Sequence, residues 1–349
     1  MKVWSADFSP QVASTPSEIK ISSQYRRSFS RMFSMTHTRL FSSLWIVALS
    51  IFSVSADEPT LRPYNEIDGQ RFWHSGNTSK YFKQQSKKLH AEKKPPTRRE
   101  ILKQLEERST CSLDLPTTPV PQQPINIYQK ITEATVLIMT HDEKNDDRYG
   151  TGFFIAPGVI VSNWHVVDTA IDFPMIAAMT YDGTLLTITE GLAGNKEEDL
   201  VVLKADTGGK TFPHLALAPN LPNPGTELWQ CGHTHAAYWT FTDGIINRYC
   251  MEPFNLDDGK PKRDHGVIDI SHKVSAGSSG SPLMNARGEL VGIYHHRRWY
   301  NQTEKNFVAP KNNKIDEAKR PHIEDRVVLF ERNLAIPVTA LRAMLTPKP

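Results

Sequence analysis

From residue 125 onward the chain alternates short apolar runs with turns rich in Gly, Pro, Asn and Asp. Short runs bounded in this way are typical of β-strands. A first set is predicted near residues 135–139, 152–155, 159–162, 176–181, 185–188 and 200–203. A second set is predicted near residues 227–230, 240–247, 267–270, 282–284, 290–294 and 327–330, followed by a helix over 338–345. Two sets of about six short strands predict an all-β protein built from two small barrels or sandwiches.

Residues 57–124 are polar and interrupted by prolines. The capping-box pattern from Thr97 to Glu100, followed by three apolar residues on one face, predicts one helix there. Four prolines between residues 116 and 124 predict a stiff linker. We expect a polar, solvated extension, and the basic pairs at 87–88, 93–94 and 98–99 leave processing by a protease as the alternative.

Residues 1–56 have the pattern of a leader. Arg39 precedes an apolar run from residue 40 to 54 that only serines interrupt, and Ala56 ends a group of small residues. This run is shorter than the roughly 20 residues that a membrane span needs. The pattern predicts a signal peptide cleaved after Ala56, with an uncleaved anchor as the alternative. We therefore expect an exported protein, secreted or periplasmic, without a stable membrane span; Met32 or Met35 is an alternative start.

The formal net charge of +3 comes from this leader. Residues 1–56 carry six Lys and Arg against two acidic residues, which leaves the remainder close to neutral. A nearly neutral body offers no electrostatic basis for binding nucleic acid, so no nucleic-acid partner is expected.

Three cysteines, Cys111, Cys231 and Cys250, would meet an oxidising compartment after export. Cys231 and Cys250 flank one predicted hairpin, which makes them the favoured disulfide pair. Small buried residues without a disulfide are the alternative, because spacing does not fix connectivity.

The strongest chemical signal is the Gly- and Ser-rich segment 275–283, which surrounds Ser279. A nucleophilic serine needs an exposed Oγ and nearby main-chain N–H groups to hold an oxyanion. Gly277 and Gly280 permit a tight turn that supplies both, so we assign the oxyanion donors to the amides of Gly277 and Ser279. A loop without chemistry is the alternative. An α/β-hydrolase elbow would need glycine where Ser281 stands.

Two further segments supply a base and an acid. His165 follows a predicted strand, where a general base can face a cleft, and Asp199 begins an apolar strand, where it can accept the imidazole Nδ1–H. His165 and Asp199 fall in the first strand set and Ser279 in the second. This order predicts a triad of His165, Asp199 and Ser279 in a site between the two sets.

These segments resemble the chymotrypsin-like serine peptidases, especially the HtrA (Deg) proteases and bacterial glutamyl endopeptidases. Residues 162–167 resemble a "TNxHVV" strand end, 199–204 a "DLAVLK" strand and 277–283 a "GNSGGPL" or "GNSGSP" loop. Two weaker likenesses to HtrA proteases are found at residues 241–246 and 333–337. The resemblance covers about residues 125–345.

The resemblance implies a peptidase domain over 125–349. Its two six-stranded antiparallel β-barrels would span about 125–215 and 220–335, with a short C-terminal helix at 338–345. It implies a serine endopeptidase that cleaves protein or peptide substrates through an acyl-enzyme, with no cofactor and no metal. The alternatives are an inactive homologue acting as a binding module and a secreted esterase. The PDZ domain of HtrA proteases is not expected, and the oligomeric state stays open.

Ser278 departs from the trypsin pattern, where an Asp before the nucleophile receives the amine freed by zymogen cleavage. Ser278 has no carboxylate for that ion pair. We therefore expect that residues 57–123 are not an activating propeptide of the trypsin kind.

The substrate pocket is expected to involve Lys273, Tyr294 and His295, and basic residues here leave open a preference for acidic side chains. The polar stretch 297–326 has no counterpart in HtrA proteases and is either functional, folding over the groove, or disordered. His233, His235 and the pair at 295–296 lack matching ligands at structural-zinc spacing, so no metal site is predicted.

Overall fold

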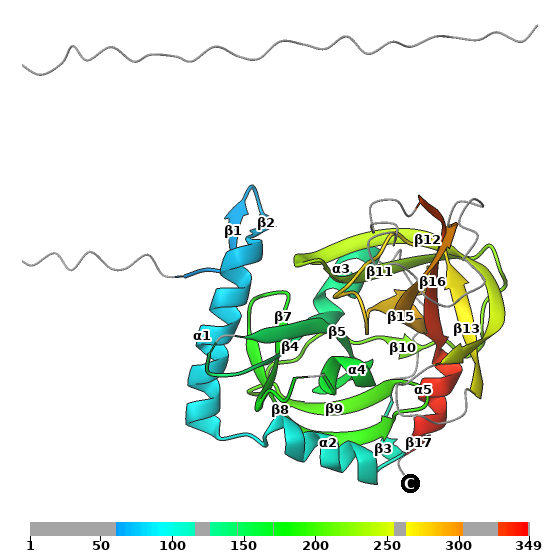
Figure 1. Cartoon of the computed structure of the whole chain (residues 1–349). Helices are drawn as coiled ribbons and strands as arrows, with labels where there is room; N and C mark the ends of the chain where they lie inside the picture. The colour runs from blue at the N-terminus through cyan, green and yellow to red at the C-terminus, as the bar shows by residue number, and fades with distance from the viewer. Residues whose placement is uncertain are drawn as a thin grey trace, which may run out of the picture. The chain divides into compact units, whose positions relative to one another are not determined.

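A computed structural model of the chain describes residues 61–115, 126–144, 146–169, 171–254, 263–302 and 327–347 (Figure 1). The expected signal peptide, the Pro-rich linker and residues 303–326 of the polar stretch lie outside the described residues. No helix within the described ranges is long and apolar enough to cross a membrane.

The first strand set closes into a barrel. Its strands pair antiparallel in the order β4-β5-β6-β9-β8-β7. They are β4 (Thr135–His141), β5 (Asp147–Ala156), β6 (Val159–Asn163), β7 (Met175–Thr180), β8 (Leu185–Asn195) and β9 (Leu200–Asp206). Successive residues of β4 point to opposite faces and both faces are buried, because Ile138 belongs to an apolar cluster drawn from all six strands and Leu137 to a second cluster.

The second strand set forms a sheet whose pairings run in a ring, β14-β11-β12-β13-β16-β15 and back to β14. Its strands are β11 (Glu227–Thr234), β12 (Ala237–Phe254), β13 (Arg263–Ile270), β14 (Pro282–Met284), β15 (Glu289–Gln302) and β16 (Val327–Pro337), with the short β10 (Ala216–Leu217) added parallel to β15. Helix α5 (Val338–Met344) follows. The twelve predicted strands and the C-terminal helix are confirmed, although β12 and β15 are much longer than expected.

Residues 64–113 fold onto this body, which differs from the expected solvated extension. The segment forms β1 (Tyr64–Ile67), β2 (Gln70–Trp73), α1 (Ser75–Lys93), α2 (Arg98–Glu107) and β3 (Cys111–Leu113). Figure 1 shows α1 and α2 running along the first barrel. The remaining elements are α3 (Ile127–Ala134) and α4 (Trp164–Val167), together with β17 (Leu345–Pro347), which pairs parallel with β3.

Both helices of this segment contribute buried side chains. On α1, Phe82 is fully buried and the Ser86 hydroxyl lies 2.7 Å from Nε2 of His141 on β4. The capping box predicted for α2 is present, and Ile101 and Leu105 on that helix join the apolar cluster of the barrel strands. The segment was expected to be solvated because polar residues dominate it. Its few apolar residues, however, lie on the buried faces of α1 and α2.

Arg98 at the start of α2 holds the loop that follows α4. Its guanidinium is almost fully buried and donates to the main-chain oxygens of Val167 and Phe173 and to the Asp172 carboxylate. A buried guanidinium is stable only with such partners. The N-terminal segment therefore fixes a loop of the first barrel.

The favoured disulfide between Cys231 and Cys250 is absent, and these two cysteines and Cys111 are free thiols. Cys231 on β11 lies opposite Phe241 of β12, nine residues before Cys250. Nine residues of extended strand span about 30 Å, far more than a disulfide allows. The expectation was wrong because β12 continues well past the hairpin.

Replacing Ile101 by Ala in the full chain is expected to lower the free energy of unfolding by about 2–5 kcal/mol, because it leaves a cavity between α2 and the barrel. Denaturant unfolding measures the change. Lys103→Ala on the exposed face of the same helix is the control and should stay within about 0.5 kcal/mol. Equal stability of Ile101→Ala and the parent chain would contradict the packing of α2.

Candidate active site

Asp199 occupies a strained turn at the start of β9. Its φ of 52° is in the left-handed region, which is uncommon for a residue other than glycine. Its main-chain oxygen accepts hydrogen bonds from the Trp164 amide and from the Asn163 side chain, both at 3.0 Å. These two bonds join the turn to the end of β6 and to the first residue of α4, the short helix that carries His165.

The Asp199 carboxylate makes two contacts with His165. Oδ1 accepts the His165 main-chain N–H at 2.9 Å, and Oδ2 lies 2.7 Å from the ring Nδ1. The carboxylate is 1% exposed, whereas the His165 side chain is 42% exposed. The outer edge of the imidazole therefore remains open to a substrate.

The charges of this pair are coupled. Burial alone would raise the pKa of Asp199, but the imidazoles of His165 and His295 hold it below its usual range. Burial would lower the pKa of His165, and the adjacent carboxylate outweighs this effect and raises it. Asp199 is thus ionised near neutral pH and stabilises a cation on His165, as a base-orienting acid must.

Ser279 lies in the turn before β14. Thr151 of the first barrel holds this turn by two hydrogen bonds. The Thr151 amide donates to the Ser279 main-chain oxygen and its hydroxyl to the Gly277 oxygen, both at 2.8 Å. Gly277 and Gly280 have φ of 92° and 86°, and a Cβ at either would approach a main-chain oxygen to within 2.3 Å. Only glycine fits these two positions, as the sequence predicted.

Ser279 and His165 are not joined by a hydrogen bond in this structure. The Ser279 hydroxyl donates instead to the main-chain oxygen of His295 at 3.1 Å. Among the described residues, the amides of Gly277 and Ser279 donate to no protein acceptor. Two unused donors beside a serine hydroxyl are the arrangement that an oxyanion site requires.

The sequence did not place His295 beside the acid. Its ring Nδ1 lies 2.7 Å from Asp199 Oδ2, and its side chain is 12% exposed. The two histidine rings have centroids 5.8 Å apart. No local signal reveals this contact, because residues 199 and 295 come from different strand sets.

The ligand atoms of His165, Asp199 and His295 lie within 4.8 Å of one another, a grouping that could hold a metal ion. Around a tetrahedral zinc ion, ligand atoms stand about 3.4 Å apart. The two Nδ1–Oδ2 distances of 2.7 Å are shorter and match direct contacts between imidazole and carboxylate. The expectation of no metal stays a prediction.

A hollow of about 660 Å³ adjoins the nucleophile loop. Lys273 and Arg297 both line it. Lys273 is exposed, and the Arg297 guanidinium pairs with the Glu331 carboxylate at 3.6 Å. His295 and Tyr294, the other two expected pocket residues, are not among the lining residues. Tyr294 is buried in an apolar cluster and its hydroxyl donates to Asn333. Tyr294 therefore belongs to the core of the second sheet and does not line the hollow.

Two of the histidines considered as metal ligands lie elsewhere. His233 is fully buried, and burial lowers its pKa to about 3. Nε2 of His235 lies 2.8 Å from the hydroxyl of Ser275. We therefore interpret both histidines as structural residues.

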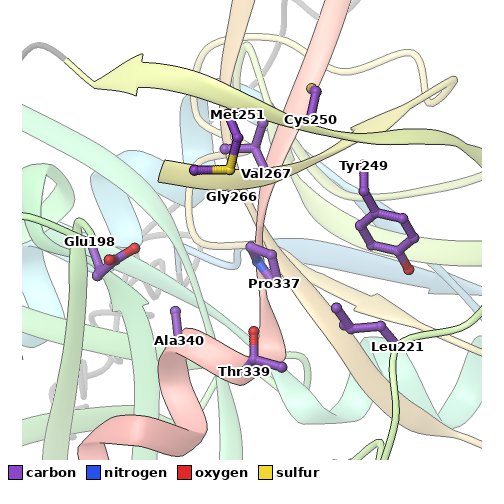
Figure 2. A pocket seen from close by; sticks show the side chains of 10 residues that line it. All are labelled: Glu198, Leu221, Tyr249, Cys250, Met251, Gly266, Val267, Pro337, Thr339 and Ala340. Carbon is purple, nitrogen blue, oxygen red and sulfur yellow. The ribbon is translucent and has the colours of Figure 1, made fainter. Parts of the chain in front are cut away.

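A second hollow, of about 580 Å³, is lined mainly by apolar residues of β12, β13 and α5 (Figure 2). Glu198, the neighbour of Asp199 in the chain, lies on one side of it, and its carboxylate is 3.0 Å from Nδ1 of His265. None of the three expected triad residues lines this hollow, whereas Ser275 of the loop that carries Ser279 lines the first one.

The sequence profile described as "Trypsin-like peptidase domain" matches residues 150–293. The serine protease HhoA of Synechocystis sp. is 32% identical over 175 residues, 49% of this chain and 41% of HhoA. The serine protease HTRA1B of Danio rerio is 27% identical over 177 residues, 48% of this chain and 35% of HTRA1B. The match thus spans less than half the length of each of these relatives.

Among solved structures, the Rv3671c protease from M. tuberculosis in its active form is similar to this chain. Its TM-score is 0.47 at 18% identity, with 68% of this chain and 96% of that chain covered.

The buried Ser278 generates a prediction about activation. Its hydroxyl lies 2.6 Å from that of Thr234, and it offers no carboxylate to a new N-terminus. The chain that retains residues 57–123 should therefore be labelled at Ser279 by a fluorophosphonate without prior cleavage. Intact mass of the labelled protein, with Ser279→Ala as the unlabelled control, measures this; label found only on a truncated chain would contradict it.

Proposed function

We propose that the chain is an active serine endopeptidase with a trypsin-like peptidase domain and with His165, Asp199 and Ser279 as its triad. The observation that carries the proposal is the buried Asp199 carboxylate 2.7 Å from Nδ1 of a half-exposed His165. The unused amides of Gly277 and Ser279 support it, because they stand ready beside the proposed nucleophile.

In the proposed mechanism the Ser279 hydroxyl first turns from the His295 carbonyl towards Nε2 of His165. His165 takes the hydroxyl proton while Oγ attacks the peptide carbonyl, and the amides of Gly277 and Ser279 hold the resulting oxyanion. The C–N bond breaks as His165 gives the proton to the leaving amine. Water, deprotonated by the same imidazole, then attacks the acyl-enzyme. The C–Oγ bond breaks, the acid is released, and the imidazole returns the proton to Ser279 Oγ.

We further propose that the protein is exported, secreted or periplasmic. The apolar run before Ala56, too short for a comfortable membrane span, supports this proposal. N-terminal sequencing of the mature protein tests it, and a mature chain beginning before residue 40 would contradict cleavage after Ala56.

Ser279→Ala should lower peptide hydrolysis by several orders of magnitude, because it removes the hydroxyl that attacks the carbonyl carbon in the proposed mechanism. Turnover of a quenched-fluorescent casein or peptide library measures the loss. Ser281→Ala, two residues along in the same loop, is the control and should keep activity. Hydrolysis of simple esters without any peptide cleavage would favour an esterase instead.

We also propose the hollow beside Ser275 as the pocket for the side chain before the cleaved bond, with an acidic side chain preferred. Arg297 is already paired with Glu331, whereas Lys273 makes no ion pair with a described residue. The lining therefore presents a net positive charge, which attracts a carboxylate.

Lys273→Glu should reverse this preference. The parent chain is expected to cleave after Asp or Glu at least about tenfold better than after Lys or Arg, and the variant to show the opposite order. Ratios of kcat/KM on matched peptides measure it, with Lys103→Glu on the outer face of α2 as the charge-matched control. A preference for Val or Leu in both proteins would contradict the acidic pocket.

A further inference from the structure

His295 contacts all three residues of the proposed triad. Its ring Nδ1 lies 2.7 Å from Asp199 Oδ2, its ring meets that of His165 in a T-shaped arrangement, and its main-chain oxygen accepts the Ser279 hydroxyl. One residue of β15 thus touches the acid, the base and the nucleophile by separate groups.

A β-bulge places His295 in this position. Opposite β16, Tyr294 pairs with Ala335 and His296 with Leu334, so His295 is the extra residue of β15 at that step. A bulged residue leaves the ladder and its side chain is re-aimed. The bulge therefore directs the ring towards Asp199 and leaves the His295 carbonyl available to Ser279.

We propose that His295 is a positioning residue, a second imidazole that shares the Asp199 carboxylate with His165. The inference deepens the proposed function and rests on it. A buried carboxylate is stable only when donors satisfy its oxygens. Oδ1 is occupied by the His165 amide, so both rings converge on Oδ2.

Sharing one carboxylate couples the two rings electrically. His165 must become a cation while Ser279 attacks, and Asp199 stabilises that cation. Because the two rings share a single negative charge, a positive charge on one ring disfavours a positive charge on the other. Among the described residues, Asp199, His165 and the adjacent His296 are titratable side chains that contact His295.

Kinetics form the first test. Using the full chain, His295→Ala should lower kcat about 10- to 100-fold with KM changed less than threefold, since a donor to a charged group is lost. His295→Asn keeps an N–H donor and should recover most of kcat. His296→Ala removes the neighbouring imidazole as the matched control and should change kcat less than threefold. Equal kcat for His295→Ala and the parent would overturn the proposal.

Titration of the imidazoles tests the coupling without turnover. In the Ser279→Ala chain with isotope-labelled histidine, the NMR signals of His165 should shift in two steps as pH falls, because two rings share one carboxylate. With His295→Asn added, they should shift in one step. One step in both proteins would overturn the coupling.

The two tests separate this inference from the proposed function. If Ser279→Ala retained full peptide hydrolysis, the endopeptidase assignment would fail. The number of titration steps at His165 would still decide whether His295 shares the carboxylate, because that measurement needs no substrate.

Discussion

The site depends on the interaction of the buried Asp199 carboxylate with His165. An ionised group withdrawn from water is costly unless donors surround it. Here the donors are the His165 amide and ring, with the His295 ring on the same oxygen. The left-handed backbone of Asp199 belongs to the same arrangement, because it lets the main-chain oxygen hold α4 while the side chain holds the imidazole. Strain of this kind persists only where surrounding contacts determine it.

Those contacts come from both strand sets and from the N-terminal segment. His165 and Asp199 stand on the first barrel, whereas His295 and Ser279 stand on the second sheet. Thr151 joins the two by donating twice to the nucleophile loop. Arg98 fixes the loop that follows α4 from outside the barrel. The N-terminal segment, which covers a barrel face, is therefore part of the framework of the site.

Much of this architecture could be predicted from the sequence, and the failures have physical causes. Short apolar runs between turns revealed the twelve strands. The order of the motifs identified His165, Asp199 and Ser279 as candidates. Helix α1 was missed because a polar sequence hides its few buried residues, such as Phe82 and Ser86. The contact of His295 was missed because a bulge decides where its ring points, and no local pattern announced that bulge.

The bulge also explains how one strand can serve two purposes. In a regular ladder, a residue of β15 would use its carbonyl for pairing and alternate its side chain with its neighbours. His295 is released from both constraints, so its ring turns to Asp199 while its carbonyl receives the Ser279 hydroxyl. In this structure the Ser279 hydroxyl is hydrogen-bonded to the His295 carbonyl and not to His165. In the proposed mechanism the hydroxyl must leave that carbonyl before proton transfer to His165 can begin.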